Sequence, residues 1–489
     1  MDNVYLSKPK YCRAKQCNKM LWMDRNKPEE AMLLNKDNVF ETGTRVGELA
    51  KHFFGEYIDI EFNKDLSKMI EQTERELRRI PIIIAEASFN YNNNFCSVDI
   101  LKNDKDGIEI YEVKSSTEIS DVYLEDVSYQ VYVLLNLGYN VKKVNIMYIN
   151  NKYIRQGELD LKQLFNVEDV TEIAYSRQKE IQNKINEINE YMQVKEEQDE
   201  KIGLHCFEPY ECAYWNYCTK NLPQKNVFSI SRMGKKEKFD LYNNGIISYN
   251  DLEKEDIKEK FKQQVVVELS NETIIKKSEI QEFINTLTYP LYFLDFETFQ
   301  QAIPEYDGIR PYMRIPFQYS LHYIEKEDGD LKHTEYLAEE GIDPRRELAE
   351  HLVTDIPQDV CVTAYNMGFE KSVIRELAEQ FEDLSDKLMN IHDNIKDLMI
   401  PFQKRWYYTK EMEGSYSIKY VLPALFPNDP KLDYHNLPVV HNGGEASAVF
   451  GALGEKTKEE QKIIRDGLLK YCKLDTLAMV KVWEKLKEV

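Results

Sequence analysis

The segment IPIIIAEASFNYNNNFCSVDILKNDKDGIEIYEVKSS, residues 80–116, alternates apolar runs with Asn-rich and Asp-Lys-Gly turn sequences. Short apolar runs between such turns predict three strands joined by tight connections. DVSYQVYVLLNLG, residues 126–138, then has the apolar spacing of a helix and ends at a glycine. VKKVNIMYIN, residues 141–150, predicts another strand, and residues 1–60 favour helices. We therefore expect helices, a strand meander, a helix and a strand.

The pattern restarts with YPLYFLDFET, residues 289–298, an apolar run that predicts a strand ending in acidic residues. Strand and helix character then alternate in PFQYSLHYI, DPRRELAEHLVTDI, VCVTAYN and FEKSVIRELAEQF, residues 316–324, 343–356, 360–366 and 369–381. The C-terminal stretch from Glu459 favours one long helix. This half is expected to be a mixed α/β domain of about 200 residues, an ordinary domain size.

Two charged stretches lie between these halves. Residues 168–202 predict a long helix, and residues 226–285 predict short helices that carry no chemical motif. We therefore expect a multi-domain α/β fold with an N-terminal domain (1–225), a helical connector (226–285) and a C-terminal domain (286–489).

The charge of the chain bears on its partners. The 489 residues carry a formal net charge of −21. Nucleic-acid-binding proteins commonly present a basic surface, so this charge counts modestly against DNA as a ligand. A metal-dependent nuclease concentrates carboxylates in its sites, however, and a whole-chain sum hides a local basic face. With no apolar run of about 18 residues and no signal-peptide core in MDNVYLSKPKYC, we expect a cytoplasmic protein without a membrane partner.

The predicted meander carries three acidic residues and a lysine. Glu112 and Lys114 are two apart on one strand and point to the same face, and Asp99 ends the preceding strand opposite them. Facing carboxylates can hold Mg²⁺, which can supply a hydroxide nucleophile and neutralise a phosphate. A neighbouring lysine can position the water or stabilise the developing charge. An ordinary hairpin with surface acids is the alternative explanation of this pattern taken alone.

The order Asp99, twelve residues, Glu112-x-Lys114 and a helix with Gln130 resembles the PD-(D/E)XK nucleases of the RecB type. The resemblance implies Asp99 and Glu112, with Glu86 upstream, as metal ligands. It also implies Lys114 as a catalytic residue and Gln130 as a residue that supports the site and contacts DNA.

Two departures from this family's pattern matter. The tyrosine of the helix motif stands at Tyr132, closer to Gln130 than in the family. Where many members have a metal-binding histidine four residues after a glycine, counting from Gly43 gives Gly47, and His52 is out of register. Weakened or absent catalysis in this domain is therefore the alternative.

Three of the eight cysteines form a tight group in HCFEPYECAYWNYC: Cys206, Cys212 and Cys218. Disulfides are disfavoured in the cytosol, so metal or cluster ligation is the better explanation. The five-residue spacing is wider than that of most zinc sites. Cys96, Cys361 and Cys472 lie in apolar segments and are expected in the core.

A cysteine before the nuclease core and three after it resemble the iron–sulfur class of RecB-like nucleases. This class includes the CRISPR-associated adaptation nucleases and the AddB-type repair nucleases. The resemblance implies a 4Fe–4S cluster that joins the two ends of the domain, held by Cys17, Cys206, Cys212 and Cys218. Cys12 is the rival to Cys17, Asn18 replaces the proline that usually follows the first cysteine, and zinc is the alternative to iron and sulfur.

Three acidic segments follow one another in the C-terminal half. Asp295 and Glu297 are two apart at the end of a strand. Glu370, in NMGFE, lies at a strand-to-helix junction, and Tyr471 and Asp475 share one face of a helix. Acids converging from three elements can hold two divalent ions, and a tyrosine can orient the attacking water.

This order resembles the DnaQ-like 3′→5′ exonucleases of the RNase H fold, in the class with Tyr-x-x-x-Asp. The resemblance implies two Mg²⁺ or Mn²⁺ ions held by Asp295, Glu297, Glu370 and Asp475, with Tyr471 as a catalytic residue. Glu370 stands where the family usually has aspartate, and Asp397 is the fallback acid. GSYSIKYVLPALFP and HNGGEASAVF, between the second and third motifs, fit either substrate contact or packing.

The combined resemblance implies a two-site DNA nuclease that trims single strands from the 3′ end, in repair, CRISPR adaptation or phage defence. Its partners would be DNA with single-stranded ends and other defence or repair proteins. A DNA-end-binding scaffold with an inactive site is one alternative, motivated by Gly47 and Glu370. RNA trimming by the C-terminal domain is the other.

Overall fold

The computed structural model describes residues 5–33 and 37–489. The chain is a mixed α/β protein of two compact units. The first comprises Met1–Asn221 and Gln301–Tyr312, and the second comprises Leu222–Gln300 and Met313–Val489. Residues 226–285, predicted as a connector, lie in the second unit. Within the described ranges, no helix combines the length and the apolar character needed to cross a membrane.

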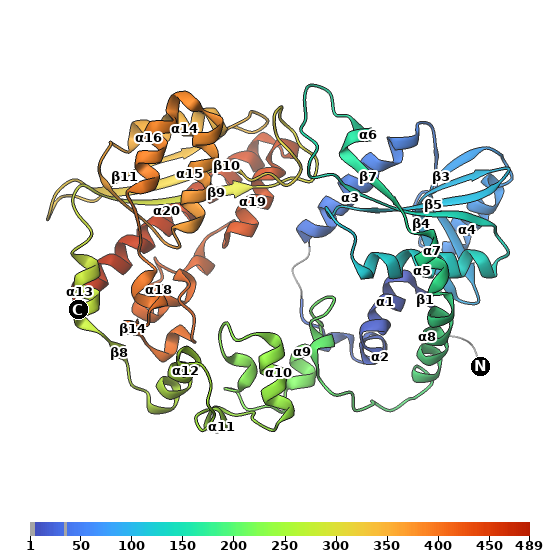
Figure 1. Ribbon diagram of the computed structural model, residues 1–489, viewed down its shortest axis with the longest axis horizontal. Helices are drawn as coiled ribbons and strands as arrows, with labels where there is room; N and C mark the ends of the chain where they lie inside the picture. Colours follow the sequence, from blue (N-terminus) through green and yellow to red (C-terminus); the bar gives the residue numbers. More distant parts are fainter. Residues whose placement is uncertain (1–4, 34–36) are drawn as a thin grey trace. The chain divides into compact units, whose positions relative to one another are not determined.

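A seven-stranded sheet forms the centre of the first unit (Figure 1). Its order is β2-β3-β4-β5-β6-β7, with β1 beside β4. The strands are β1 Leu6–Ser7, β2 Ile58–Asp59, β3 Ile82–Tyr91, β4 Asn94–Asp104, β5 Gly107–Lys114, β6 Val141–Ile149 and β7 Phe165–Asp169. β3, β4 and β5 are the predicted antiparallel meander, whereas β5 and β6 are parallel. Parallel neighbours need a crossover, which helix α5 (Asp121–Asn136) supplies.

The regular alternation of the meander breaks at the predicted acids. Val98 and Ile100 are two apart on β4 yet pack into different core clusters. Opposite them, Glu86 has a φ of 58°, a left-handed conformation within a strand. A non-glycine residue pays strain energy for this conformation. Local breaks of this kind re-aim side chains next to functional sites, and here the break falls where Glu86 faces Asp99.

The other helices of the first unit are α1 Lys8–Gln16, α2 Asn18–Asn26, α3 Asp37–Lys51, α4 Leu66–Glu76, α6 Leu161–Leu164, α7 Thr171–Ser176, α8 Gln178–Tyr191 and α9 Trp215–Thr219. The helix predicted for residues 168–202 is confirmed in part, because α7 and α8 make residues 171–176 and 178–191 helical. That segment ends strand β7, forms α7 and α8, and leaves the helical conformation after Tyr191. Its high content of helix-favouring residues hid the short strand, which pairs with β6.

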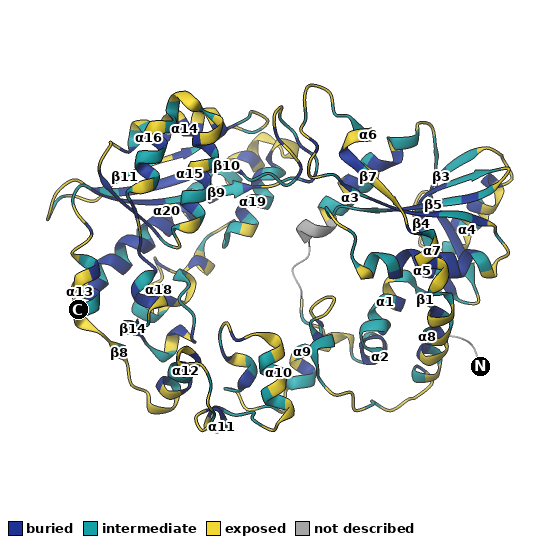
Figure 2. Cartoon of the chain, viewed as in Figure 1, coloured by how far each residue is buried: buried dark blue, intermediate teal, exposed yellow. Residues whose placement is uncertain are grey.

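The second unit has a five-stranded sheet with the order β11-β10-β9-β12-β13. The strands are β9 Leu291–Phe299, β10 Ile315–Ile324, β11 Lys332–Leu337, β12 Cys361–Ala364 and β13 Ile395–Asp397. Strands β9, β10 and β11 are antiparallel, whereas β12 and β13 join in parallel. β9 and β10 are buried along almost their whole length (Figure 2). The predicted apolar strand β9 is therefore the central strand.

Helices surround this sheet and also form a smaller layer at the start of the unit. The larger helices are α14 Arg345–Asp355, α15 Gly368–Gln380, α16 Glu382–Asp393, α18 Ile418–Leu425, α19 Gly443–Gly451 and α20 Lys458–Lys487. The C-terminal helix α20 packs on β9 and β10. The predicted connector contains α10 Lys235–Asn243, α11 Tyr249–Leu252, α12 Glu259–Ser270 and α13 Lys277–Ile284, and has a small apolar core around Val227, Phe261 and Val265.

Close packing of α20 gives a test of the fold. A Cβ atom on Gly467, within α20, would lie 2.6 Å from Val439 Cβ, closer than real contacts allow. We expect Gly467→Ala to destabilise the second unit by about 1–3 kcal/mol in denaturant titrations, because overpacking outweighs the gain in helix propensity. Gly47→Ala, in helix α3 with open space at its Cβ position, is the matched control and should stabilise. An equal stabilisation of both variants would contradict this packing.

Candidate functional site

Glu112 is the centre of the first candidate site. Its Oε1 atom accepts a hydrogen bond of 2.8 Å from Lys114 Nζ, and its Oε2 atom accepts one of 2.6 Å from Gln130 Nε2. Strand β5 supplies Glu112 and Lys114, and the crossover helix α5 supplies Gln130. The meander and the helix that follows it thus bring the predicted glutamate, lysine and glutamine into direct contact.

Asp99 and Glu86 complete the predicted set from the neighbouring strands. Asp99 Oδ2 accepts a hydrogen bond of 2.6 Å from the backbone amide of Val113, which fixes the carboxylate beside β5. Burial, and then the charge of Asp99, raise the pKa of Glu86 to about 7. Burial and Glu112 raise the pKa of Asp99 to about 6. Both groups are held where carboxylates oppose one another's ionisation, which a bound cation would relieve.

Glu112 differs from these two acids. Burial alone would raise its pKa, but Lys114 and Lys8 overcome that effect and lower the pKa to about 2. Burial opposes the charge of Lys114, yet Glu112 and Asp126 raise the pKa of its ammonium group well above the usual value. The site therefore pairs an ionised glutamate and a charged lysine with two acids that ionise near neutral pH.

Sequence reasoning missed two residues of this site. Asp126, on α5, accepts from Lys114 Nζ at 2.6 Å and from Cys12 Sγ at 3.1 Å. Lys8, at the start of α1, donates to Glu112 Oε1 at 2.5 Å. Neither residue belongs to a spaced motif with Glu112. Lys8 is 104 positions away, and the spacing of Asp126 before Gln130 on one helix was the only available signal.

Gly47 lies on α3, whereas His52 lies in the short 3-10 turn that follows this helix. His52 is exposed and its ring contacts the ring of Tyr57. Lys51, beside it, is buried and donates 2.8 Å to Glu48 Oε1, and its charge lowers the pKa of Glu86 against the stronger effect of burial. A lysine, not a histidine, is therefore the basic residue that α3 brings near Glu86.

The four cysteines of the predicted cluster line one small cavity. Cys17 lies between α1 and α2, Cys206 ends a short 3-10 turn, Cys212 follows in a loop, and Cys218 lies on α9. Its other lining residues are apolar or charged, among them Met20, Met23, Lys19 and Glu200. Cys12 is not among the lining residues, because its thiol bonds to Asp126 in the first site.

The thiols of this cavity affect one another's ionisation. Burial raises the pKa of Cys212 to about 11, the amide of Tyr214 lowers it, and Cys206, Cys17 and Cys218 raise it further. The Tyr214 amide donates to Cys212 Sγ at 3.4 Å. Thiolates are the ligands of zinc and of iron–sulfur clusters, and four cysteines lining one cavity are a donor set that could hold such a centre.

The second candidate site gathers on the central strand β9. One oxygen each from Asp295 and Glu297 and the Sγ atom of Cys472 lie within 4.8 Å of one another. The Cys472 thiol is 3.7 Å from Asp295 Oδ2. Cys472 is buried, as expected for a core residue, but it also borders the acids. These residues come from β9 and α20, which pack together.

Helix α20 also supplies Asp475 and Tyr471. Asp475 Oδ1 accepts a hydrogen bond of 2.6 Å from the hydroxyl of Tyr434, and the rings of Tyr434 and Tyr471 are 6.0 Å apart. Lys419 Nζ is 5.6 Å from the Tyr434 ring centroid. Tyr434 and Lys419 are further residues that sequence reasoning missed. The segments GSYSIKYVLPALFP and HNGGEASAVF, expected either to contact substrate or to pack, both border the site. Lys419 belongs to the first, and Gly443, which lies next to Glu297, belongs to the second.

Glu370 lies at the start of α15, where the strand-to-helix junction was predicted. It is 2% exposed, and its Oε2 atom has no hydrogen-bond partner within the described ranges. Burial raises the pKa of Glu370 to about 8. Asp397 Oδ1 instead accepts from the backbone amides of Asn366 (2.9 Å) and Met399 (3.0 Å), a role that holds the β12–α15 turn. Asn366 has a φ of 73° in that turn.

The acids of the second site strongly oppose one another's charge. Burial, Asp475, Glu297 and Glu370 raise the pKa of Asp295 well above its usual value. Burial raises the pKa of Asp475 to about 6, although Tyr434 and Lys419 lower it. Buried carboxylates of this kind are costly without a compensating cation, so the donor set fits divalent metal ions.

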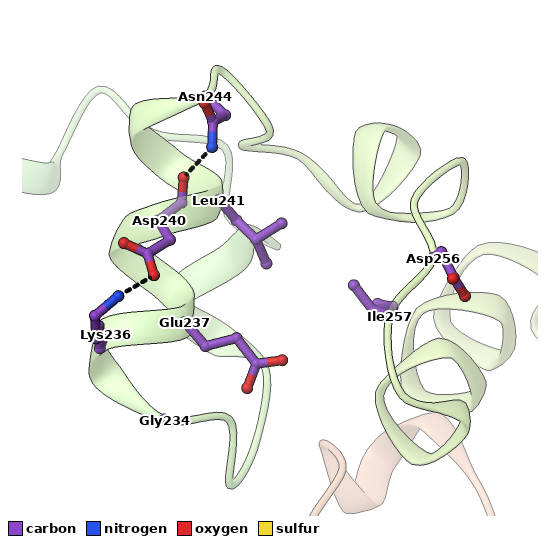
Figure 3. A pocket seen from close by; sticks show the side chains of 8 residues that line it. All are labelled: Gly234, Lys236, Glu237, Asp240, Leu241, Asn244, Asp256 and Ile257. Atoms are coloured by element: carbon purple, nitrogen blue, oxygen red, sulfur yellow. Dashed lines mark hydrogen bonds and ion pairs between the residues drawn. The ribbon is translucent and has the colours of Figure 1, made fainter.

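A further hollow lies in the second unit between α10 and the chain around Ile257 (Figure 3). Three of its four charged lining residues, Lys236, Glu237 and Asp240, are already paired. Lys236 Nζ donates 2.7 Å to Asp240, and Glu237 pairs with Lys258 at 3.5 Å. We assign this hollow no chemical role.

Comparison with known proteins gives two matches. Residues 292–417 match the family described as "Domain of unknown function (DUF2779)". This segment contains Asp295, Glu297 and Glu370 but ends before α20. The chain is also 26% identical over 235 residues to "Uncharacterized protein UU173" of Ureaplasma parvum serovar 3. The aligned part covers 44% of this chain and 33% of that relative, so the chain spans about a third of the relative's length. No solved structure matches the chain.

Proposed function

We propose that this chain is a metal-dependent DNA nuclease with two active sites and a four-cysteine cluster. The observation that carries the proposal is the second site. There, Asp295 and Glu297 lie together on β9 beside Cys472 of α20, and the charges of Asp475 on α20 and Glu370 on α15 act on Asp295. Two tyrosines and a lysine lie around Asp475. Such a set has little structural use without a cation, because it buries like charges. Two-ion phosphodiester hydrolysis uses carboxylates from several elements as ligands, so this set supports the proposal.

In this proposal the second unit has a DnaQ-like fold and trims DNA strands from the 3′ end. Asp295, Glu297, Glu370 and Asp475 would hold Mg²⁺ or Mn²⁺, which supplies an activated water and stabilises the leaving oxygen. Tyr434 holds Asp475 in place through its 2.6 Å hydrogen bond. Tyr471 orients the attacking water, and Lys419 contributes positive charge toward the substrate phosphate.

The first unit is proposed to be a RecB-like PD-(D/E)XK nuclease. Glu86, Asp99 and Glu112 would hold a divalent ion, Lys114 would position the water, and Gln130 holds Glu112 through its 2.6 Å hydrogen bond. The direct contact between Gln130, Glu112 and Lys114 supports this assignment. The cavity with four cysteines supports a 4Fe–4S cluster, because its lining joins the segment around Cys17, near the start of the unit, to the segment of Cys206, Cys212 and Cys218 that follows the last strand.

The test is cleavage of end-labelled single- and double-stranded DNA, and of RNA of the same sequence, with Mg²⁺ or Mn²⁺. Wild type is compared with Lys114→Ala, Asp295→Ala and the double variant. We expect each single variant to lose a different set of products and the double variant to lose all cleavage. A 5′-labelled strand should give a ladder that depends on Asp295. Binding without metal-dependent cleavage would establish the scaffold alternative, and cleavage of RNA alone would establish the trimming alternative.

A further inference from the structure

Lys8 belongs to none of the sequence motifs, yet it contacts Glu112, the central carboxylate of the first site. Its Nζ atom donates to Glu112 Oε1 at 2.5 Å, and Lys114 donates to the same oxygen at 2.8 Å. Gln130 donates to the other oxygen at 2.6 Å. A carboxylate offers about four lone-pair positions. Three of the lone-pair positions of Glu112 therefore accept hydrogen bonds. One of these comes from the ammonium group of Lys8, a residue outside the nuclease motif.

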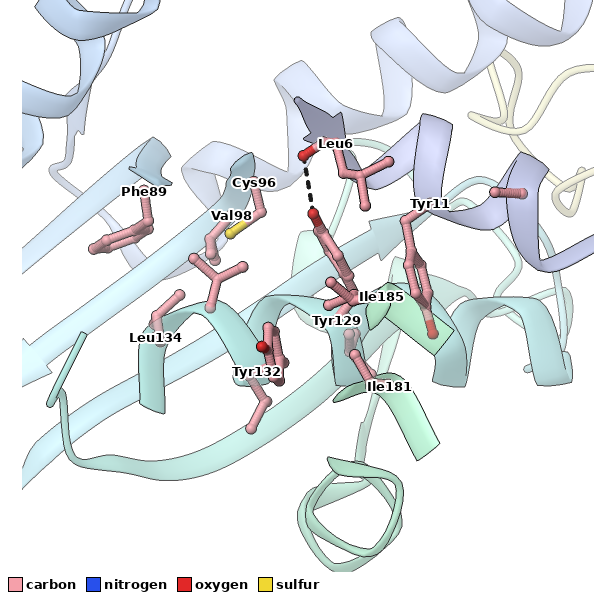
Figure 4. Packing of buried hydrophobic residues seen from close by; sticks show 14 of the residues in the cluster. Leu6, Tyr11, Phe89, Cys96, Val98, Tyr129, Tyr132, Leu134, Ile181 and Ile185 are labelled. Carbon is pink, nitrogen blue, oxygen red and sulfur yellow. Dashed lines mark hydrogen bonds between the residues drawn. The ribbon is translucent and has the colours of Figure 1, made fainter. Parts of the chain in front are cut away.

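The position of Lys8 is fixed by its surroundings, as Figure 4 shows for the neighbouring residues. The Tyr129 hydroxyl donates to the backbone oxygen of Leu6 at 2.9 Å, and the rings of Tyr11 and Tyr129 stack with centroids 4.6 Å apart. The Tyr11 hydroxyl donates to Glu125 at 2.7 Å. These contacts anchor β1 and the first turn of α1 on α5. The Lys8 ammonium is therefore held on Glu112 by the fold.

The local electrostatics give no other reason for a lysine here. Lys8 is the first residue of α1, where the helix dipole disfavours a cation. Its side chain is only 19% exposed. A cation in such a position is stabilised by the carboxylates it faces, Glu112 at 2.5 Å and then Asp99 and Asp126. The surrounding charges are Glu86, Asp99, Glu112 and Asp126 on one side and Lys8 and Lys114 on the other.

We propose that Lys8 is a positioning residue of the first site that occupies a cation position on Glu112 and thereby weakens divalent metal binding there. This inference rests on the proposed function of the first site. An ion on the same oxygen, at about 2.1 Å, would lie within about 5 Å of the ammonium group. At that separation, the two positive charges repel strongly even with protein screening. Metal must therefore bind through the remaining position on Glu112, or displace Lys8.

The experiment measures Mn²⁺ binding from the loss of the free-ion signal in electron paramagnetic resonance, with full-length protein. Asp295→Ala is the background, which removes the second site's central ligand. We expect Lys8→Met to tighten Mn²⁺ binding at the first site at least ten-fold. Lys8→Arg keeps the charge and should bind like the background protein. Lys10→Met, on the exposed side of the same helix, is the matched control and should also leave the affinity unchanged.

The outcomes distinguish a failure of the role of Lys8 from a failure of the proposed nuclease function of the first site. Asp99→Ala should remove the remaining Mn²⁺ site. If it does not, the metal assignment of the first site fails, and the role of Lys8 fails with it. If Asp99→Ala removes the site but Lys8→Met binds Mn²⁺ equally or more weakly, the nuclease site stands and the proposal for Lys8 is overturned. Thermal melts of each variant establish that the compared proteins are folded.

Discussion

Asp295→Asn will make the metal-free protein more stable and will remove cleavage by the second site. Asparagine keeps the shape of aspartate but carries no charge, so the repulsion with Asp475, Glu297 and Glu370 disappears. We expect the free energy of unfolding at pH 8 to rise by about 1–3 kcal/mol, the usual scale for an uncompensated buried polar group. We expect the rate of 3′ trimming to fall at least about 100-fold, because a direct metal ligand matters more than its outer partners.

The same buried carboxyl groups make the stability of the metal-free protein decrease as the pH rises. The pKa values of Glu370 and Asp475 are raised to about 8 and about 6. A carboxyl group whose pKa is raised by folding stabilises the protein below its unfolded pKa, and this stability is lost as pH rises through the folded value. The metal-free wild type should therefore lose stability as the pH rises from about 6.5 to about 8. Burial lowers the pKa values of His322 and His333 to about 3 and about 4, so both stay neutral in the folded protein while the unfolded chain protonates them below about pH 6.5. They destabilise the protein as the pH falls below that value, so the loss caused by the carboxyl groups is measured above it.

Denaturant titrations with and without Mn²⁺ check this prediction. Mn²⁺ should restore the stability of wild type at pH 8 and should have a smaller effect on Asp295→Asn. Asp466→Asn is the matched control, because Asp466 lies on the surface of α20 and pairs with Lys470 at 2.6 Å. It should change neither stability nor trimming. A destabilised Asp295→Asn protein would show that Asp295 is held by favourable structural contacts, against the proposed role.

The elements that carry the sites follow from local sequence patterns. The meander of β3, β4 and β5, the helix α5 and the strand β9 were all predicted from apolar spacing and turn residues. These patterns work because strand alternation and helix periodicity decide which face a side chain occupies. Glu112, Lys114 and Gln130 meet as the resemblance implied, since the meander and crossover leave them few alternatives.

The residues that were missed come from contacts between distant segments. Lys8 reaches Glu112 across 104 positions, and Tyr434 reaches Asp475 across 41. No periodicity links such pairs, because tertiary packing alone brings them together. The break at Glu86 was also invisible, since IIIAEASF reads as a regular strand. The helix predicted over residues 168–202 starts too early for a related reason, because pairing with β6 overrides the helix propensity of the residues in β7.

Cys212→Ser will remove the proposed cluster and will destabilise the first unit by several kcal/mol. Cys17 comes from the segment after β1, and the other three cysteines come from the segment after β7, so a bound centre cross-links the start of the unit to its end. Metal centres of this kind contribute directly to folding, because the unfolded chain does not hold them. Protein purified without air should be brown, and Cys212→Ser should be colourless. Limited proteolysis should then cut in residues 192–218, which contain little regular structure.

Cys12→Ser and Cys17→Ser test which of these two cysteines is the fourth ligand of the cluster. Cys12 lies five residues before Cys17, but its thiol donates to Asp126 at 3.1 Å, and it does not line the cavity. Cys12→Ser protein should keep the visible absorbance, whereas Cys17→Ser should lose it, as Cys212→Ser does. A colourless wild-type protein that contains one equivalent of zinc would show that the four cysteines bind zinc and not an iron–sulfur cluster. Colour that survives Cys17→Ser but not Cys12→Ser would mean that the thiol geometry around the cavity is not the one that binds the cluster.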